Sequence, residues 1–254
     1  MGDSLHTLIR DLHRRRGRER RGLALAEGVR LLEEAVAARV PFEAAVVSPA
    51  LEGTPRGRAL KAALAERGVR MAETSDHELV DLAATDHPQG VVAVLRLEPH
   101  ELGAIRIGPR SVVLVLDAVQ DPGNVGTIVR TAFALGAAGV VTLPGTAELT
   151  NPKTLRATMG ALFRLPVVPS HDEALAAWLE EHRVTLVATG AGGEPFAPAA
   201  LPRPLAMVLG NEGAGVRPAL AGSHRTVSIP LAAGAESLNV AVTAGILLYG
   251  VTRE

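Results

Sequence analysis

Three stretches of the chain place glycines and polar side chains directly after an apolar run, where the end of a strand could hold a ligand. The first, residues 117–132, reads DAVQDPGNVGTIVRTA and carries Asn124 at the start of a helix and Arg130 six positions later. These two side chains can meet only if the start of the helix is bent or a ligand bridges them. Taken alone, Asn124 also fits a simple helix cap.

The second stretch, residues 208–216, reads VLGNEGAGV, so the carboxylate of Glu212 stands among glycines. Glycines let backbone N–H and C=O groups approach a ligand closely, although a tight turn without a ligand has the same composition. The third stretch, residues 227–245, starts a helix with polar and small residues: Ser237, Asn239, Ala241, Ala244 and Gly245. A capped helix that packs closely on a neighbour explains much of this stretch without a ligand.

Other kinds of site lack their signatures. Gly190–Gly193 follows an apolar run, but Pro195 stands where a dinucleotide fingerprint needs its third glycine, and no phosphate-binding loop is present. The eight histidines have no metal-ligand spacing, and the chain contains no cysteine. These observations disfavour a Rossmann-type methyltransferase or dehydrogenase, a hydrolase and a metalloenzyme.

The composition indicates a soluble globular protein. Hydrophobic residues make up 47% and charged residues 21% of the chain, and no apolar run is long enough to span a membrane. The arginine-rich N-terminus is not followed by the apolar stretch of a secretory signal, so we expect a cytoplasmic protein. The chain has only four phenylalanines, one tryptophan and one tyrosine, which argues against a surface that stacks single-stranded bases.

The charge is distributed unevenly. Residues 13–21 read HRRRGRERR, and all the basic side chains after His13 are arginines. Such a run fits contacts with nucleic-acid phosphates, and it equally fits the solvated end of a helix.

Strands alternate with helices along the chain, which predicts an α/β fold. In a first domain, residues 1–97, we expect strands at 23–28, 42–48, 69–72 and 90–97 and helices at 29–39, 56–67 and 76–82. Residues 98–110 are polar and contain glycine and proline, which predicts a linker. In a second domain, residues 111–254, we expect strands at 112–116, 139–143, 166–168, 184–188, 205–209 and 226–229 and helices at 125–135, 152–160, 172–182 and 238–253. The continuous apolar run 112–116 is typical of a parallel strand that is buried on both faces.

The three stretches, taken in order, resemble the motifs of the SpoU (TrmH-type) RNA ribose 2′-O-methyltransferases of the SPOUT superfamily. They read D-x-x-Q-D-P-x-N-x-G-x-x-x-R-T-A, then G-N-E-G-x-G, then I-P-L-x(5)-S-L-N-V-A-V. Three further segments resemble the N-terminal substrate-binding domain of that family. They are the arginine run at 13–21, residues 26–35 (AEGVRLLEEA) and residues 87–90 (HPQG). The N-terminus is shorter and lacks the family's usual Asn-Pro stretch, so the RNA target stays open.

This resemblance implies a catalytic domain with a parallel sheet and a C-terminal trefoil knot, preceded by a small α/β RNA-binding domain that is similar to a ribosomal-protein fold. It implies S-adenosylmethionine as the methyl donor and no metal. The cofactor-binding positions that it implies are Leu209, Gly210, Gly213, Ile229, Leu231 and Leu238. It also implies a homodimer, for which we expect the small face of the last helix, at Ala241, Ala244 and Gly245, to form the interface.

The resemblance assigns the catalytic positions to Asn124, Arg130, Glu212, Ser237 and Asn239. A guanidinium is always protonated and has no acceptor, so Arg130 is expected to bind the target phosphate and the developing alkoxide rather than to act as a base. Glu212 is the alternative base, and the other residues are expected to orient the ribose and the cofactor. The expected RNA contacts are Arg14, Arg15, Arg16, Arg18, Arg20, Arg21 and Arg30.

The expected activity is methylation of a ribose 2′-hydroxyl in RNA, with 23S rRNA as the expected substrate. Two alternatives stay open: a tRNA ribose 2′-O-methyltransferase and a non-catalytic RNA-binding factor for ribosome assembly. The assembly factor would be expected to have eroded cofactor motifs, whereas all three stretches are intact here.

Overall fold

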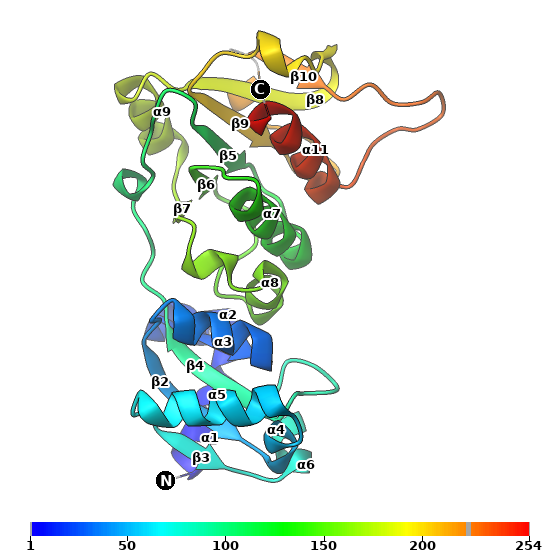
Figure 1. Ribbon diagram of the computed structural model, residues 1–254. Helices are drawn as coiled ribbons and strands as arrows, with labels where there is room; N and C mark the ends of the chain where they lie inside the picture. The colour runs from blue at the N-terminus through cyan, green and yellow to red at the C-terminus, as the bar shows by residue number, and fades with distance from the viewer. Residues whose placement is uncertain (1, 222–224, 254) are drawn as a thin grey trace. The chain divides into compact units, whose positions relative to one another are not determined.

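The computed structural model describes residues 2–221 and 225–253. The chain divides into two compact units (Figure 1), the first made of residues 1–98 and 148–163 and the second of residues 99–147 and 164–254. Each unit has its own sheet and its own buried core.

The sheet of the first unit has the order β1-β4-β2-β3. Its strands are β1 (Leu23–Glu27), β2 (Phe42–Val47), β3 (Met71–Glu73) and β4 (Val91–Arg96). Successive side chains of β1 and β4 alternate between two cores, as a pleated strand requires. Ala24 and Val91 join one core, whereas Leu25 and Val92 join the other.

Helices cover both faces of this sheet. The helices of the N-terminal sequence are α1 (Gly2–Leu12), α2 (Arg15–Arg21), α3 (Val29–Ala37), α4 (Pro49–Glu52), α5 (Pro55–Glu66) and α6 (Asp76–Val80). Leucines of α1 and α6 pack in one core, and leucines of α3 and α5 pack in the other. The expected strands and the expected helices of this region are all present, and α1, α2 and α4 are additional.

Residues 148–163 come from the expected second domain but pack in the first unit. They contain α8 (Pro152–Thr158) and the 3-10 turn η2 (Ala161–Phe163). Leu155 is completely buried in the core that α3 and α5 form, and Leu162 and Phe163 pack against the same core. An apolar pattern predicts that a helix is buried, but it does not specify which core the helix joins.

The sheet of the second unit has the order β10-β8-β9-β5-β6-β7, and its neighbouring strands run parallel. The strands are β5 (Val112–Leu116), β6 (Gly139–Thr142), β7 (Val167–Pro169), β8 (Thr185–Pro195), β9 (Leu205–Leu209) and β10 (Arg225–Ser228). These findings confirm the α/β class with a parallel sheet in the second unit. Because β6 and β9 flank β5 on opposite sides, the chain changes direction at β5 and β9, and ligands of parallel sheets bind outside the carboxyl ends at such a point.

Helices α9 (Asp172–Glu181) and α10 (Pro218–Ala221) contribute to the core on one face of this sheet. Helices α7 (Pro122–Ala134) and α11 (Val240–Thr252) pack against each other and contact β6 and β5. Short 3-10 turns, η1 (Leu102–Ala104) and η3 (Pro198–Ala200), lie in the connections. In Figure 1 the segment between β10 and α11 projects from the sheet as a long loop.

In the second unit α10 was not expected, and several boundaries differ from expectation. The strand expected at 184–188 continues to Pro195, because β10 pairs with it on both sides of an irregularity. Helix α7 begins at Pro122 rather than at residue 125, since Asp121 caps it and a proline suits the first helical position. Helix α11 begins at Val240 rather than at residue 238, because Asn239 is its N-cap.

The small residues of α11 are used inside the chain. Ala241 and Ala244 are 7% and 0% exposed, and a Cβ on Gly245 would lie 3.7 Å from the Cγ2 of Thr131 on α7. The expectation that these residues form the dimer face is therefore wrong, because they form the contact between α11 and α7. The trefoil knot stays a prediction. Within the residues that the structure describes, no helix is long and apolar enough to cross a membrane.

Candidate active site

A buried carboxylate fixes the loop that follows β9. Asp117, directly after β5, is completely buried and accepts hydrogen bonds from the backbone N–H of Arg217 at 2.8 Å and from its Nε at 2.6 Å. Arg217 also donates from both Nη atoms to Asp172, at 3.1 and 2.9 Å. Hydrogen bonds to Asp172 and Asp117 raise the pKa of Arg217. Sequence reasoning did not single out Arg217. The available signal was its partner Asp117, a charged residue that directly follows the buried strand β5 and therefore needs a cationic partner.

The loop between β9 and Arg217 is a tight turn built on glycine. A Cβ at Gly210 would overlap the backbone of Gly215, so this position admits only glycine. The backbones of Asn211 and Gly215 exchange hydrogen bonds at 3.0 and 2.9 Å. The Asn211 side chain donates to the carbonyl of Ala118 at 2.9 Å and accepts from the N–H groups of Gly213 and Ala214. The turn is thus held rigidly, with Glu212 at its tip.

Side chains from the three stretches meet in one chain of hydrogen bonds. Asn239 donates from Nδ2 to Oδ1 of Asn124 at 3.0 Å, and Asn124 donates from Nδ2 to Oε1 of Glu212 at 3.0 Å. The three residues come from the start of α11, the first turn of α7 and the loop after β9. A single amide therefore connects all three stretches.

The two asparagines have different backbone roles. Asp121 is the N-cap of α7 and accepts from the N–H of Asn124 at 2.8 Å, so the simple-cap interpretation of Asn124 is wrong. Asn239 is itself the N-cap of α11, because its Oδ1 accepts from the N–H groups of Ala241 and Val242 at 2.9 and 3.3 Å. Its Nδ2 is directed to Asn124 at the same time.

Glu212 is surrounded by donors. Besides Asn124, the backbone N–H groups of Gln120 and Asp121 donate to its carboxylate at 3.3 and 3.4 Å. Burial raises the pKa of Glu212, but the hydrogen bonds from Asn124 and the backbone outweigh it, and the net pKa is lowered. A carboxylate with a lowered pKa and occupied lone pairs is a weak proton acceptor, which favours an orienting role over that of a base.

Arg130 and Ser237 lie outside this hydrogen-bond chain. Arg130 is exposed on α7, and across residues 2–221 and 225–253 its side chain makes no hydrogen bond or ion pair. Ser237 is exposed in the loop that projects between β10 and α11. The structure brings Asn124, Glu212 and Asn239 together and leaves Arg130 accessible to an anion.

The expected cofactor positions lie in two segments. Leu209 is buried at the end of β9, and Gly210 and Gly213 belong to the turn that follows. Ile229 directly follows β10, and Leu231 and Leu238 are both 38% exposed in the projecting loop. A glycine turn with accessible backbone groups and exposed leucines suits a ligand with an apolar base and a polar tail, so these residues fit S-adenosylmethionine.

The arginine run forms α2, and its members have different roles. Arg18 is 4% exposed; it donates from Nε and Nη2 to Glu148 at 3.0 and 2.6 Å and from Nη1 to the carbonyls of Leu12 and His13 at 2.9 Å. The expectation that Arg18 contacts RNA is therefore withdrawn, because its guanidinium holds residues 148–163 on the first unit.

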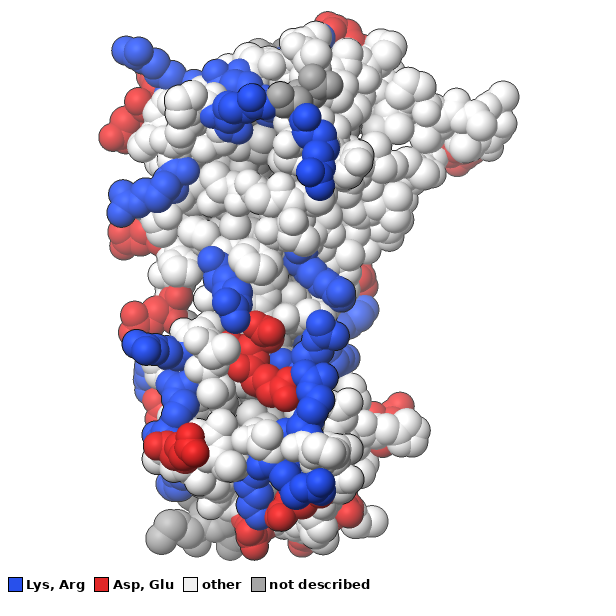
Figure 2. All heavy atoms as spheres, in the orientation of Figure 1, with Lys and Arg blue, Asp and Glu red and all other residues white. Residues whose placement is uncertain are grey.

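The remaining arginines are accessible. Arg15 pairs with Glu19, and Arg20 and Arg21 pair with Asp11, all at the surface. Arg14, Arg16 and Arg30 are exposed. Figure 2 shows that positive and negative side chains alternate over the visible face instead of forming one basic patch. Among the residues with a described placement, no cluster of three or more His, Cys, Asp or Glu could hold a metal ion.

Comparisons with known proteins identify the family of the chain. The sequence model of the SpoU rRNA Methylase family matches residues 111–249, and that of the MRM3-like substrate binding domain matches residues 7–93. The 23S rRNA (guanosine(2553)-2′-O)-methyltransferase RlmP of Bacillus subtilis is 38% identical over 186 residues, which are 72% of this chain and 73% of that protein.

Two further proteins match almost end to end. The 23S rRNA (uridine(2479)-2′-O)-methyltransferase of Streptomyces viridochromogenes is 32% identical over 96% of this chain and 87% of its own length. The crystal structure of an AdoMet-bound rRNA methyltransferase from Sinorhizobium meliloti has a TM-score of 0.87 and 29% identity, and the match covers 100% of this chain and 95% of that one. With its family match, its parallel sheet and the convergence of its three motifs, the chain belongs to the SpoU rRNA methylase family.

Proposed function

We propose that this protein transfers a methyl group from S-adenosylmethionine to a ribose 2′-hydroxyl of 23S rRNA. The observation that carries this proposal is the hydrogen-bond chain from Asn239 through Asn124 to Glu212 at the carboxyl ends of β5 and β9. It gives the three family stretches one common site. Relatives named as 23S rRNA 2′-O-methyltransferases support the same reaction and the same class of RNA.

The residues of this chain must orient the reactants and accommodate negative charge. S-adenosylmethionine supplies a methyl group on a positively charged sulfur, so the site needs no metal to activate it. A ribose hydroxyl is a weak nucleophile, and its attack depends on alignment and on donors that stabilise the alkoxide that develops. Arg130, exposed and always protonated, binds the target phosphate and this oxygen, and the proton passes to a phosphate oxygen or to water.

The polar residues share the task of positioning. The hydrogen bond between Asn239 and Asn124 fixes the starts of α11 and α7 relative to each other. The ionised Glu212 then orients the Asn124 amide and the backbone N–H groups of Gln120 and Asp121 through its hydrogen bonds. Ser237 is assigned to the orientation of the ribose and the cofactor. The positions assigned to the cofactor are Leu209, Gly210, Gly213, Ile229, Leu231 and Leu238.

The active form is proposed to be a homodimer. Val242, Ile246 and Tyr249 of α11 are 51%, 41% and 58% exposed, and their spacing puts them on one stripe of the helix. Phe133 of α7, 44% exposed, is a further exposed apolar side chain on the helix that packs against α11. The occupant that we assign to this stripe is the same stripe of a second copy, which is the symmetric arrangement that most dimers use.

The first unit is proposed to bind the RNA. Its exposed arginines are available for phosphate contacts. They are Arg14, Arg15, Arg16, Arg20, Arg21 and Arg30. The relatives named as rRNA methyltransferases support a cytoplasmic location. The C-terminal trefoil knot belongs to this proposal through the family resemblance.

Calorimetry and methyl transfer test the proposal together. We expect the protein to bind S-adenosylmethionine in calorimetry and to transfer its labelled methyl group to deproteinised 23S rRNA. Alkaline hydrolysis needs a free 2′-hydroxyl, so the labelled nucleotide should survive as an alkali-resistant dinucleotide. A protein that binds RNA but not S-adenosylmethionine would instead be an assembly factor, and transfer only to tRNA would overturn the choice of RNA.

A further inference from the structure

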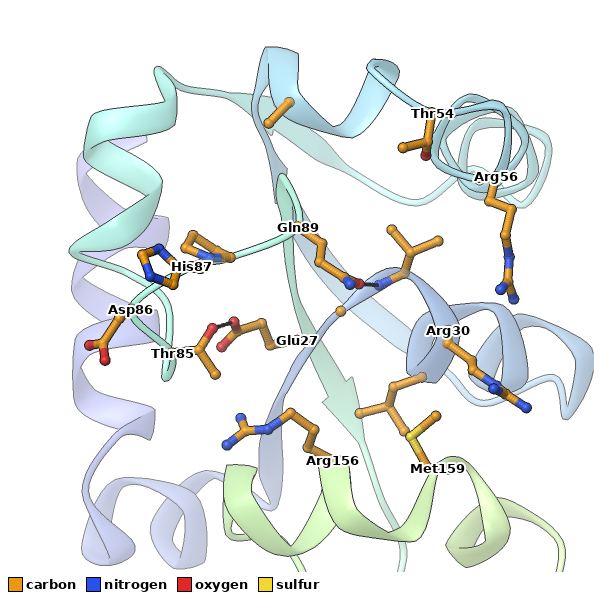
Figure 3. A pocket seen from close by; sticks show the side chains of 15 residues that line it. Glu27, Arg30, Thr54, Arg56, Thr85, Asp86, His87, Gln89, Arg156 and Met159 are labelled. Atoms are coloured by element: carbon orange, nitrogen blue, oxygen red, sulfur yellow. Dashed lines mark hydrogen bonds between the residues drawn. The ribbon is translucent and has the colours of Figure 1, made fainter.

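The first unit contains a half-open cavity of about 940 Å³ that shares no residue with the hydrogen-bond chain described above. The end of β1, the start of α3, the loop before β4 and helix α8 surround it (Figure 3). Its volume is near the upper end of the range for small-molecule sites, about 300–1,000 Å³. The cavity is therefore large enough for a ligand bigger than a phosphate ion.

The rim of this cavity is fixed by hydrogen bonds. Glu27, 5% exposed, accepts from the N–H of Ala84 at 2.7 Å and from the hydroxyl of Thr85, which orders the loop before β4. The side-chain oxygen of Gln89 accepts from the N–H of Val29 at 2.9 Å, which joins the loop before β4 to the start of α3 (Figure 3). A site with a prearranged rim loses little conformational freedom when a ligand binds.

Arg156 of α8 supplies a positive charge without a protein partner. Its Nη1 is buried, and no group in the described part of the chain accepts a hydrogen bond from it. Buried donors of this kind are rare in native proteins and call for an explanation. Figure 3 shows the Arg156 side chain reaching along the cavity beneath Glu27 and Thr85. An anionic ligand would give this guanidinium the acceptor that it lacks.

The other walls combine apolar and polar groups. Val29, Leu31 and Met159 contribute apolar surface, whereas Thr54, Asp86 and Gln89 contribute hydrogen-bonding groups. Apolar walls, polar groups for base edges and a guanidinium for a phosphate are together what one nucleotide requires. A simple anion would leave the apolar walls without a role.

A second hollow, of about 440 Å³, shares Thr85, Asp86 and Arg156 with this cavity. Its lining also contains His13, Asn151 and Lys153. Arg156 borders both hollows. A polymeric ligand with one residue in the larger cavity could therefore continue through the smaller one. This continuity favours an RNA strand over a free small molecule.

We propose that the cavity binds one unpaired nucleotide of the RNA substrate, with its base against Val29 and Met159 and its phosphate on Arg156. The inference rests on the proposed function, because it deepens the account of how RNA is held. It places RNA recognition partly on α8, a helix that lies within the sequence matched by the methylase family but packs in the first unit.

The first arm of the test uses mononucleotides on the full-length protein. We would titrate AMP, CMP, GMP and UMP, the four nucleosides and inorganic phosphate, and follow backbone amide resonances by NMR. The nucleotides should shift Gly28, Thr85 and Gln89 more than nucleosides or phosphate do, and Arg156→Ala should remove the response. The matched control is Arg70→Ala, which removes an exposed arginine of the same unit outside both hollows.

The second arm uses deproteinised 23S rRNA in a filter-binding assay. Arg156→Ala should weaken binding about tenfold or more, the loss expected for a hydrogen-bonded charge, and Arg70→Ala should weaken it much less. Arg156→Lys keeps the charge but loses the planar fork, so its affinity should lie between those of Arg156→Ala and the parent. Thermal unfolding checks that each variant is folded, and the lysine variant carries the test if the alanine variant is not.

Equal RNA affinity of Arg156→Ala and Arg70→Ala would overturn the proposal. Equal resonance shifts with phosphate and with nucleotides would also overturn it, because the cavity would then hold only an anion. A protein that responds to nucleotides through Arg156 but transfers no methyl group would support this cavity and contradict the proposed function. The two proposals can therefore fail separately.

Discussion

The side-chain amide of Asn239 donates a hydrogen bond of 3.0 Å to Oδ1 of Asn124, which precedes it by 115 residues in the chain. Asn239 caps α11 with its oxygen, and Asp121 caps α7 through the N–H of Asn124. The bond between the two asparagines therefore fixes the start of one helix against the start of the other. This contact also positions the side-chain amide of Asn124, whose Nδ2 donates to the carboxylate of Glu212.

We predict that Asn124→Ala disconnects the three stretches. The substitution removes the donor to Glu212 and the acceptor for Asn239, and each lost bond of this kind costs about 1–3 kcal/mol if a partner is left unsatisfied. Affinity for S-adenosylmethionine, measured by calorimetry, should fall about tenfold or more. Thr127→Ala, at an exposed position of the same helix, is the control and should bind like the parent. Unchanged affinity of the Asn124 variant would contradict the positioning role.

Glu212 should give the site a pH dependence with a defined sign. Its folded-state pKa is lowered from the ordinary value of 4.5, so its contribution to stability is fully present above that value and is lost as the pH falls through the lowered pKa. We therefore expect the difference in free energy of unfolding between the parent and Glu212→Gln to be constant at neutral pH and to shrink in acid. Urea titrations at several pH values measure it. A difference that grows as the pH falls would show that the folded-state pKa is raised instead.

Sequence reasoning located the strands that carry the site better than the helices that flank it. The runs 112–116 and 205–209 coincide with β5 and β9, because continuous apolar stretches between polar or glycine residues leave little choice of boundary. Helix α7 begins three residues earlier than expected, because Pro122 is its first helical residue although proline is equally common in turns. The convergence of Asn124, Glu212 and Asn239 was expected only from the family resemblance, since separations of 88 and 115 residues leave no local pattern.

Burial and packing partners were the features that the sequence did not specify. Arg18 lies in a run of arginines, and nothing in that run distinguishes the buried guanidinium from the exposed ones. Leu155 was expected in a helix but not in the core of the other unit. Small residues on α11 indicated close packing, but they did not indicate whether the neighbour was α7 or a second copy.

We predict that the arginines of α2 and its preceding turn divide into two functional groups. Replacing Arg14, Arg15 and Arg16 together by alanine should weaken RNA binding and flatten its salt dependence, because each lost phosphate contact lowers the log–log slope by about 0.7–0.9. A slope that is lower by about two to three units in filter-binding assays is the expected result. An unchanged slope would exclude these residues from the RNA interface.

Arg18→Ala should instead destabilise the first unit. It leaves the partly buried Glu148 without its bidentate partner, and breaking a largely buried pair costs about 3 kcal/mol or more. Arg15→Ala, whose pair with Glu19 is exposed, is the control and should change the free energy of unfolding by less than about 1 kcal/mol. Similar urea midpoints for the two variants would contradict the structural role of Arg18.

We predict that a charge on the exposed stripe of α11 separates the dimer. Ile246→Asp places a carboxylate at the centre of the stripe formed with Val242 and Tyr249, where burial in an interface would leave it unpaired. Sedimentation velocity should show a monomer. The control is Val80→Asp, at an exposed apolar position of the first unit, which should sediment like the parent. If Ile246→Asp sediments unchanged, the stripe is not the dimer interface.

The central claim is that the site described above methylates a ribose 2′-hydroxyl, and a nucleotide-resolution map of 2′-O-methylation in 23S rRNA tests it most directly. The map would compare cells that lack the gene with the same cells supplied with the parent protein or with Arg130→Ala. We predict one position that is methylated only with the parent protein, since Arg130 is needed for the reaction. Identical maps in the three strains, or full methylation with Arg130→Ala, would contradict the account.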